Sequence, residues 1–259
     1  MHLQANSGGI AIITGPTSGI GKAFAHLLAS KGYEQVLVAR DKDRLDELAA
    51  DLTNKYRVSC EVIVADLATE AGANHAAKRC ADESKPIAVL VNNAGFGIKT
   101  SFEKTPVTQE EAMLNVLVRA PMLLTHAALP VMRKRGRGHL VHIGSVAAWI
   151  TSGTYSAAKA WLTTFSESLS VALAGTGVTS TVVAPGFVRT EFQQRAGMKP
   201  PDVPNWMWLS ARLVAQQAWQ DVLAGKTVSV PSLQYKVLST LTRGLPRPLV
   251  RRVSKDVMR

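Results

Sequence analysis

The sequence predicts a single, doubly wound α/β domain: a parallel β-sheet with helices on both faces. Short apolar runs alternate with segments of helical periodicity along most of the chain. A glycine-rich turn joins the first apolar run to the first amphipathic segment. The 259 residues, 46% of them hydrophobic, suffice for one large core. We expect a short tail over residues 1–8, the domain over residues 9–232 and an extension over residues 233–259.

Seven short segments are predicted strands; the first is a continuous apolar run, which is typical of a strand buried in a parallel sheet, and the third alternates loosely. In chain order they are residues 9–14, 36–40, 58–65, 87–91, 139–145, 179–184 and 227–231. Predicted helices cover residues 22–31 and 42–55, and two more carry Asn115 and begin near Tyr155. Ligands bind at the carboxyl ends of parallel strands. Six residues fall at such ends and should share one rim: Gly15, Arg40, Asp66, Asn93, Ser145 and Pro185.

The turn after the first strand predicts a dinucleotide site. Gly15 allows the tight turn, while Gly19 and Gly21 let the backbone approach a pyrophosphate and let the helix pack closely. The free N–H groups at the start of that helix favour phosphate charge. A strand before the turn and a helix after it make this glycine pattern informative.

The end of the second strand predicts NADP(H) rather than NAD(H). An acidic residue there binds the 2′-hydroxyl of the adenosine ribose, whereas an arginine accommodates a 2′-phosphate. This chain has Arg40 at that place, and its first acid, Asp41, comes after the strand. The alternative role for Arg40 is an ion pair with Asp43 or Glu47 on the next helix.

Other polar residues at strand ends extend the predicted site. Asp66 can bind an adenine amino group or cap the next helix, and the sequence leaves both open. Asn92-Asn-Ala-Gly95 predicts a wall beside the cofactor. Asn115 lies between two apolar residues of a helix, where an asparagine competes with its own backbone, so it needs a specific reason.

Tyr155 and Lys159 are the strongest candidates for catalysis. They lie four residues apart on a predicted helix, so their side chains address the same volume. A nearby positive charge favours a phenolate and lowers the pKa of a tyrosine. Such a tyrosine can exchange a proton near neutral pH.

Composition bears on the localisation of the protein, on metal sites and on its partners. We find no apolar run of membrane-spanning length, no secretory signal and no metal or redox spacing around Cys60 and Cys80, so we expect a cytoplasmic protein without a metal site. The net charge of +11 suggests a polyanionic partner. No nucleic-acid motif accompanies the basic clusters, so we expect no nucleic-acid partner.

These motifs together resemble the short-chain dehydrogenase/reductase family. The matches are Thr14-Gly-Pro-Thr-Ser-Gly-Ile-Gly21, Asp66, Asn92-Asn-Ala-Gly95, Asn115, Ser145, Tyr155 with Lys159, and Pro185-Gly186, in family order over residues 9–231. The resemblance implies a Rossmann-like domain with a seven-stranded parallel sheet. It also implies hydride transfer between a nicotinamide cofactor and a carbonyl or alcohol.

The resemblance also implies residue roles. Tyr155 would be the general acid/base, Lys159 would tune it and bind the nicotinamide ribose, and Ser145 would polarise the substrate oxygen. Asn115 would support a water that relays protons to Lys159. The implied cofactor-binding residues are Gly15, Thr17, Ser18, Gly19, Ile20, Gly21, Arg40, Asp66, Leu67, Asn93, Ala94, Gly95, Tyr155, Lys159, Pro185, Gly186, Val188 and Thr190.

One departure concerns the loop before Tyr155. Only nine residues separate it from Ser145, fewer than the family usually has, so Ser152 is the alternative serine. A second way to explain the motifs is a regulatory protein that binds the cofactor without turnover.

The remaining segments suggest a substrate and partners. Residues 187–210, where the family places its substrate lid, are rich in Pro, Met and Trp. They favour a hydrophobic ketone such as a β-ketoacyl, lipid or steroid-like group, unless the lid packs on the core instead. The basic, leucine-rich extension predicts a docked helix, a contact with a partner subunit or peripheral membrane contact. The resemblance implies a homo-oligomer, either a dimer or a tetramer.

Overall fold

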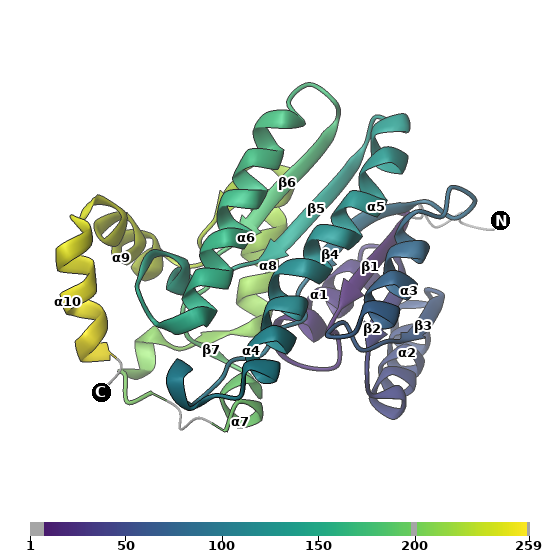
Figure 1. The fold of residues 1–259 in the computed structure, drawn as a ribbon. Helices are drawn as coiled ribbons and strands as arrows, with labels where there is room; N and C mark the ends of the chain where they lie inside the picture. The colour runs from purple at the N-terminus through teal and green to yellow at the C-terminus, as the bar shows by residue number, and fades with distance from the viewer. Residues whose placement is uncertain (1–7, 198–200, 258–259) are drawn as a thin grey trace.

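Seven parallel strands form the centre of the molecule in the computed structural model, which describes residues 8–197 and 201–257 (Figure 1). They are β1 (Ile10–Thr14), β2 (Glu34–Ala39), β3 (Cys60–Val64), β4 (Ile87–Asn92), β5 (Gly138–Ile143), β6 (Val178–Val183) and β9 (Val228–Ser229). Their order across the sheet is β3-β2-β1-β4-β5-β6-β9. This confirms the predicted fold class and the seven-stranded parallel sheet.

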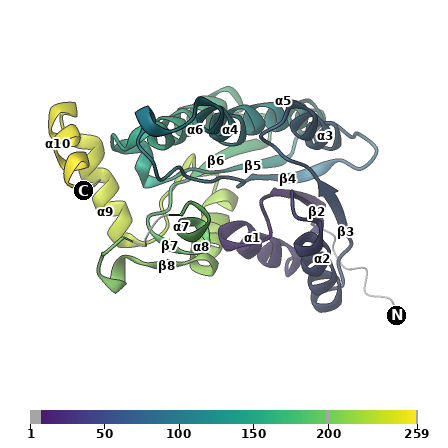
Figure 2. The ribbon, with the colours of Figure 1, turned by 60° about the horizontal axis from the view of Figure 1, so that its bottom comes forward.

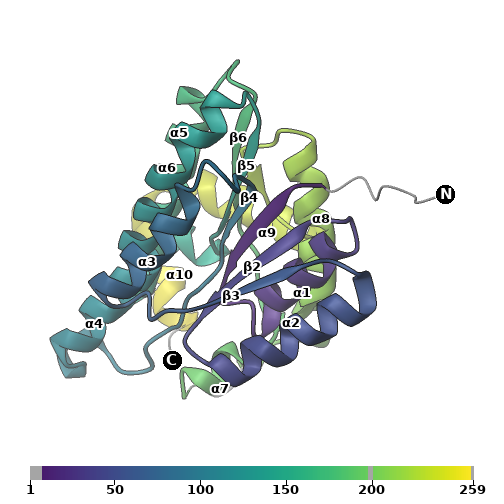
Figure 3. The same cartoon turned by 90° about the vertical axis from the view of Figure 1, so that its right-hand side faces the viewer.

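Helices cover both faces of the sheet, as Figures 2 and 3 show from two directions. One layer holds α1 (Gly19–Ala29), α2 (Lys42–Tyr56) and α8 (Ala211–Leu223); the other holds α3 (Glu70–Cys80), α4 (Val107–Leu114), α5 (Ala120–Lys134) and α6 (Gly153–Ala172). Each layer buries its own apolar cluster. Phe24 and Trp219 belong to the first, and Leu90 and Leu124 to the second.

Strands β1 and β4 pair with each other in parallel at the centre of the sheet, and the strand order reverses between them. The chain leaves β1 toward β2 on one side and later returns to β4 on the other. In α/β sheets, such a switch point opens a crevice at the carboxyl ends of the strands. The glycine turn and the Asn92–Gly95 segment both begin there.

Helices α4 and α5 form one continuous stretch, residues 107–134, joined by a π-helical turn at Asn115–Arg119. By length and composition this stretch could cross a membrane, although the sequence analysis expected no such run. Its buried side chains instead lie in the core, where Leu124 packs with Leu90 and Leu140 of the sheet. We therefore interpret it as a core helix.

The segment between β6 and α8 and the extension after β9 lie outside the two helix layers. The predicted lid contains β7 (Val188–Arg189), α7 (Phe192–Arg195), a 3-10 turn (Asn205–Met207) and β8 (Leu209–Ser210), and β7 pairs with β8. The extension forms two helices, α9 (Leu233–Gly244) and α10 (Arg247–Val257), which project at the left of Figure 1.

Candidate active site

The glycine turn is fastened to the end of β4 by side chains. The Thr14 hydroxyl accepts hydrogen bonds from the backbone N–H groups of Asn93 and Ala94, at 2.9 and 3.0 Å. The Asn93 amide donates to the carbonyls of Thr14 and Gly15, both at 2.9 Å. The Asn93 side chain is therefore used to hold the turn, and the predicted cofactor wall at this point is backbone.

The turn is shaped for close approach of a ligand. Gly15 and Gly19 have φ of +63° and +54°, which favours glycine. A Cβ on Gly21 would lie 2.3 Å from the Gly15 oxygen. Ser18 begins α1 without a side-chain cap, so the first-turn N–H groups, from Gly19 and Ile20 onward, are free to bind an anion. These features fit the pyrophosphate of a dinucleotide.

Arg40 follows β2 with an exposed side chain, and within residues 8–197 and 201–252 it forms no ion pair with Asp43 or Glu47. The nearby acid, Asp41, caps α2 by accepting from the Arg44 N–H at 3.1 Å. A capping carboxylate is not placed for the role of a ribose-binding acid. The second strand end therefore presents an unpaired cation.

Asp66 and Leu67 close the third strand end. The Asp66 carboxylate accepts from the Ala68 N–H at 3.0 Å, whereas the residue that caps α3 is Thr69. The alternative that Asp66 caps the helix is therefore wrong, because the helix starts too late. Leu67 is buried in the core, so only its backbone faces the site.

Tyr155, Ser145 and Lys159 come together beneath the rim. Ser145 lies two residues after β5, and its side chain is close enough to the Tyr155 hydroxyl to lower the pKa of that phenol, while the Ser152 N–H donates to Ser156 at the start of α6. Lys159 lies one turn along α6 from Tyr155, is 4% exposed and donates to the Ile143 carbonyl at 2.6 Å. Despite the shortened loop, Ser145 is the serine that reaches the tyrosine.

Burial dominates the electrostatics of Tyr155 and Lys159. Burial raises the pKa of Tyr155 to about 12, and the hydrogen bond from Ser145 opposes this only in part. Burial lowers the pKa of Lys159 to about 8. Desolvation of the phenolate is the largest cause at Tyr155, so the lowering of its pKa by Lys159 stays a prediction for the cofactor-bound protein.

Asn115 begins the π-helical turn, and its backbone and side-chain hydrogen bonds explain why an asparagine lies within this helix. Its carbonyl accepts from the Ala120 N–H, five residues on, and its side chain donates to the Ala68 carbonyl at 2.9 Å. Asn115 thus ties the long helix to the loop after β3. Its predicted water relay to Lys159 stays a prediction.

The loop after β6 borders the same crevice. The Pro185 carbonyl accepts from the Val146 N–H at 3.1 Å, and Val188 is buried at the start of the lid. Thr190 packs against Gly19, where an added Cβ would lie 2.9 Å from its methyl group. The lid therefore begins directly against the glycine turn.

Tyr235 of α9 holds this loop from behind. It is 1% exposed, and its hydroxyl accepts from the Phe187 N–H at 3.0 Å and donates to the Met207 carbonyl at 2.8 Å. A Cβ on Gly186 would lie within 2.3 Å of the Tyr235 ring. One residue of the extension thus fastens both ends of the lid.

A cavity of about 390 Å³ lies between the segment after β4, α4 and α7. Phe96 and Ile98 line it and also pack in one apolar cluster with Tyr155. Phe192, on α7, approaches Tyr155 with ring centres 5.8 Å apart. The cavity therefore lies next to the apolar cluster that includes Tyr155.

Three contributors escaped the sequence analysis: Phe192, Tyr235 and Arg44. The Arg44 guanidinium donates to the Thr17 carbonyl at 3.1 Å and binds both carboxylate oxygens of Glu191, so it connects the glycine turn to the lid. Their contacts span up to 147 residues, so no local pattern could have indicated them. The aromatic content of the lid was the available signal for Phe192 alone.

The family comparison agrees with this geometry. The family model described as short chain dehydrogenase matches residues 9–200. The chain belongs to the short-chain dehydrogenase family. This confirms the resemblance, and the protein is an oxidoreductase of that family.

Relatives within the short-chain dehydrogenase family have diverse names. Sulfoacetaldehyde reductase 2 of Chromohalobacter salexigens is 35% identical over 188 residues, covering 71% of this chain and 74% of the relative. Very-long-chain 3-oxoacyl-CoA reductase of Scheffersomyces stipitis is 31% identical over 217 residues, which cover 78% of this chain and 63% of the relative. A short-chain dehydrogenase from Sphingobium yanoikuyae, solved in complex with NADPH, has a TM-score of 0.83 at 30% identity, covering 91% of this chain and 94% of that one.

Proposed function

We propose that this short-chain dehydrogenase is an NADP(H)-dependent reductase of a hydrophobic ketone, with Tyr155 as the general acid. The observation that carries the proposal is the grouping of Tyr155, Ser145 and Lys159 beside an apolar cluster of side chains, next to the glycine turn. The bound nicotinamide would supply the hydride. The residues of the protein then position the carbonyl and deliver one proton.

The protonation state of Tyr155 favours reduction. With a pKa of about 12, the phenol keeps its proton at neutral pH, which is the state that a general acid requires. Ser145 can polarise the substrate oxygen from just after β5, and Lys159 lies below to bind the nicotinamide ribose and return a proton. Asn115 would hold the water of that relay.

The substrate class is inferred from the apolar side chains around Tyr155. Phe96, Ile98 and Phe192 make the surroundings of Tyr155 apolar, which favours a ketone with a large hydrophobic group, such as a β-ketoacyl, lipid or steroid-like ketone. The relative named a very-long-chain 3-oxoacyl-CoA reductase supports this class. Another relative is named a sulfoacetaldehyde reductase, so small anionic aldehydes should be assayed beside the hydrophobic ketones.

Replacing Tyr155 with phenylalanine tests the proposal. We expect Tyr155→Phe to lower kcat by roughly 10²–10⁴-fold, because the proton donor is lost while the ring still fills its site. NADPH oxidation against a panel of ketones is the measurement, with NADPH fluorescence titration as a control for binding. Undiminished turnover would refute the role of Tyr155. Absence of turnover in the wild type, with NADPH still bound, would favour the regulatory alternative.

Arg40→Ala tests the cofactor preference. A charge-assisted hydrogen bond to a 2′-phosphate contributes about 1.5–3 kcal/mol, so kcat/KM for NADPH should fall roughly 10- to 100-fold. The kcat/KM for NADH should not change. The exposed Arg133, far along α5, provides the matched control as Arg133→Ala. An equal loss with both cofactors would exclude Arg40 from phosphate recognition.

A further inference from the structure

The extension turns an apolar face toward solvent. The inward face of α9 carries Tyr235 and Ser239, which are 1% and 3% exposed. Six large aliphatic side chains on the outward side of α9, the linker and α10 are 37–75% exposed; this apolar face consists of Leu233, Val237, Leu238, Leu241, Leu245 and Leu249. A helix of a globular protein ordinarily packs such a stripe against its core. Here the stripe is on the outside.

Cations surround the apolar face. Its exposed basic residues are Lys236, Arg243, Arg247, Arg251 and Arg252. The sequence has no acidic residue between Asp221 and Asp256. Across the side chains described, none of these five cations pairs with a carboxylate, and Arg243 lies over the Trp149 ring, 3.9 Å from its centre.

We propose that the apolar face and its cations dock the protein on the surface of a bilayer that contains anionic phospholipid. Leucines at 37–75% exposure gain by entering the acyl boundary, and arginines beside them meet lipid phosphates. A second copy fits less well, because a twofold contact would bring two sets of five unpaired cations together. A nucleic acid would offer phosphates but nothing to cover the leucines.

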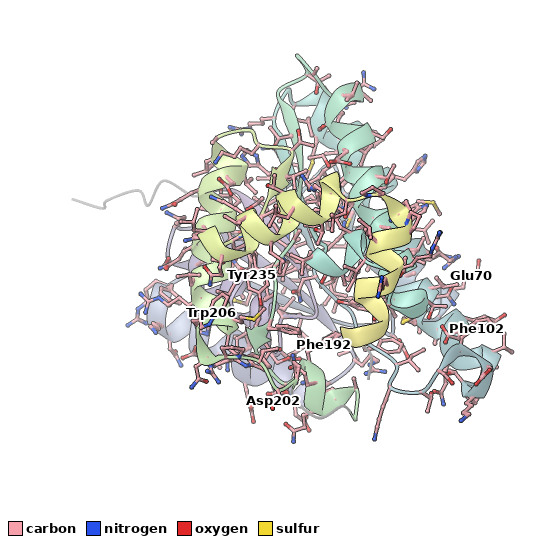
Figure 4. All side chains as sticks on the ribbon, turned by 90° about the vertical axis from the view of Figure 1, so that its left-hand side faces the viewer. Glu70, Phe102, Phe192, Asp202, Trp206 and Tyr235 are labelled. Atoms are coloured by element: carbon pink, nitrogen blue, oxygen red, sulfur yellow. The ribbon has the colours of Figure 1, made fainter. Side chains whose placement is uncertain are left out.

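The docking surface adjoins the lid. Gln234, in the first turn of α9, donates to the Trp206 carbonyl at 3.1 Å, and Trp206 is 64% exposed. Figure 4 shows Trp206 and Phe192 on the side of the molecule that α9 and α10 flank. Tryptophan favours the headgroup region of membranes, so Trp206 can join the docked surface.

Vesicle sedimentation with the full chain tests the apolar part of the proposal. Wild-type protein should bind vesicles of phosphatidylcholine with 30% phosphatidylglycerol, and bind pure phosphatidylcholine at least tenfold more weakly. The neutral change Leu241→Gln with Leu245→Gln should reduce binding more than tenfold. The matched control, Leu223→Gln with Val171→Gln, changes two exposed apolar residues elsewhere, 59% and 78% exposed, and should bind as wild type.

A second pair of variants separates local charge from net charge. Each basic residue near an anionic surface strengthens binding about fivefold, so Arg247→Gln with Arg251→Gln should weaken it roughly 30-fold. Arg133→Gln with Arg137→Gln removes the same charge from the exposed cluster after α5 and should change binding less than threefold. Equal losses in both pairs would overturn the proposal.

Two further measurements keep the proposal refutable without any variant. Binding of the wild type should fall steadily as salt rises from 50 to 300 mM, since the screening length shortens; salt-independent binding would overturn it. Sedimentation velocity tests whether a second copy of the chain, rather than a bilayer, covers the apolar face. A wild-type dimer that becomes a monomer in Leu241→Gln with Leu245→Gln, together with no vesicle binding, would assign this face to a second copy.

Discussion

Lys159 should make the free energy of unfolding depend on pH between about pH 8 and pH 10.5. Burial lowers its pKa from 10.5 to about 8. Between these values the unfolded chain holds a proton on this residue that the folded protein has released. The free energy of unfolding therefore rises with pH from about 8 to 10.5, and the destabilisation is complete below pH 8.

The size of the effect follows from the same two values. The difference between 10.5 and about 8 corresponds to about 3 kcal/mol of destabilisation at low pH. Integrated over the titration, about 1 kcal/mol of this is recovered between pH 7 and pH 9. Tyr155 does not interfere in this range, because it stays protonated in both states.

Urea unfolding at pH 7 and pH 9 measures the prediction. From pH 7 to pH 9 the free energy of unfolding of the wild type should rise by about 1 kcal/mol more than that of Lys159→Met. This variant removes the titrating group but keeps a long side chain in the pocket. Lys31→Met, at an exposed lysine, should follow wild type. Parallel pH profiles for wild type and Lys159→Met would show that Lys159 is not desolvated, and the assignment of its environment would be wrong.

Three further changes probe the rest of the site. Ser145→Ala should lower kcat roughly 100-fold in the NADPH assay while Ser152→Ala leaves it within threefold, since only the former reaches the tyrosine; the opposite ranking would assign the role to the loop serine. Gly21→Ala should destabilise the protein by about 1–3 kcal/mol in thermal unfolding and weaken NADPH binding, because its Cβ meets backbone at 2.3 Å; an unchanged melting temperature would contradict the close packing. Tyr235→Phe leaves the Phe187 N–H without its acceptor, which costs about 1–3 kcal/mol, so the lid should loosen and KM rise about tenfold with kcat less affected; unchanged kinetics would show that the lid does not need this bond.

The sheet was predictable because its strands are locally distinctive. Strands β1 and β4 are nearly continuous apolar runs followed by glycine or amide residues, and all seven predicted segments overlap the observed strands. The last predicted strand, residues 227–231, shortens to Val228–Ser229, because β9 pairs with β6 over two residues only. Helix α3 was not delimited in advance, although Thr69 caps it with a hydrogen bond to the Gly72 N–H.

The site was predictable in position more than in electrostatics. The end of a strand and a spacing of four residues are properties of sequence, and they place Ser145, Tyr155 and Lys159 together. The pKa of a buried group depends on everything packed around it, from segments far along the chain. Proximity alone therefore does not give the pKa of Tyr155 in the free protein, where burial dominates.

The two faces of α9 connect the proposed docking to the proposed chemistry. Its inward face fastens the lid through Tyr235, and its outward face carries most of the apolar face. A force on one face of a short helix is transmitted to the other, because the helix moves as a unit. If α9 shifts when the protein docks, the Phe187 and Met207 ends of the lid shift with it. Substrate entry would then be most efficient at the surface where a hydrophobic ketone is concentrated, and anionic vesicles should lower KM for such a ketone in wild type but not in Leu241→Gln with Leu245→Gln.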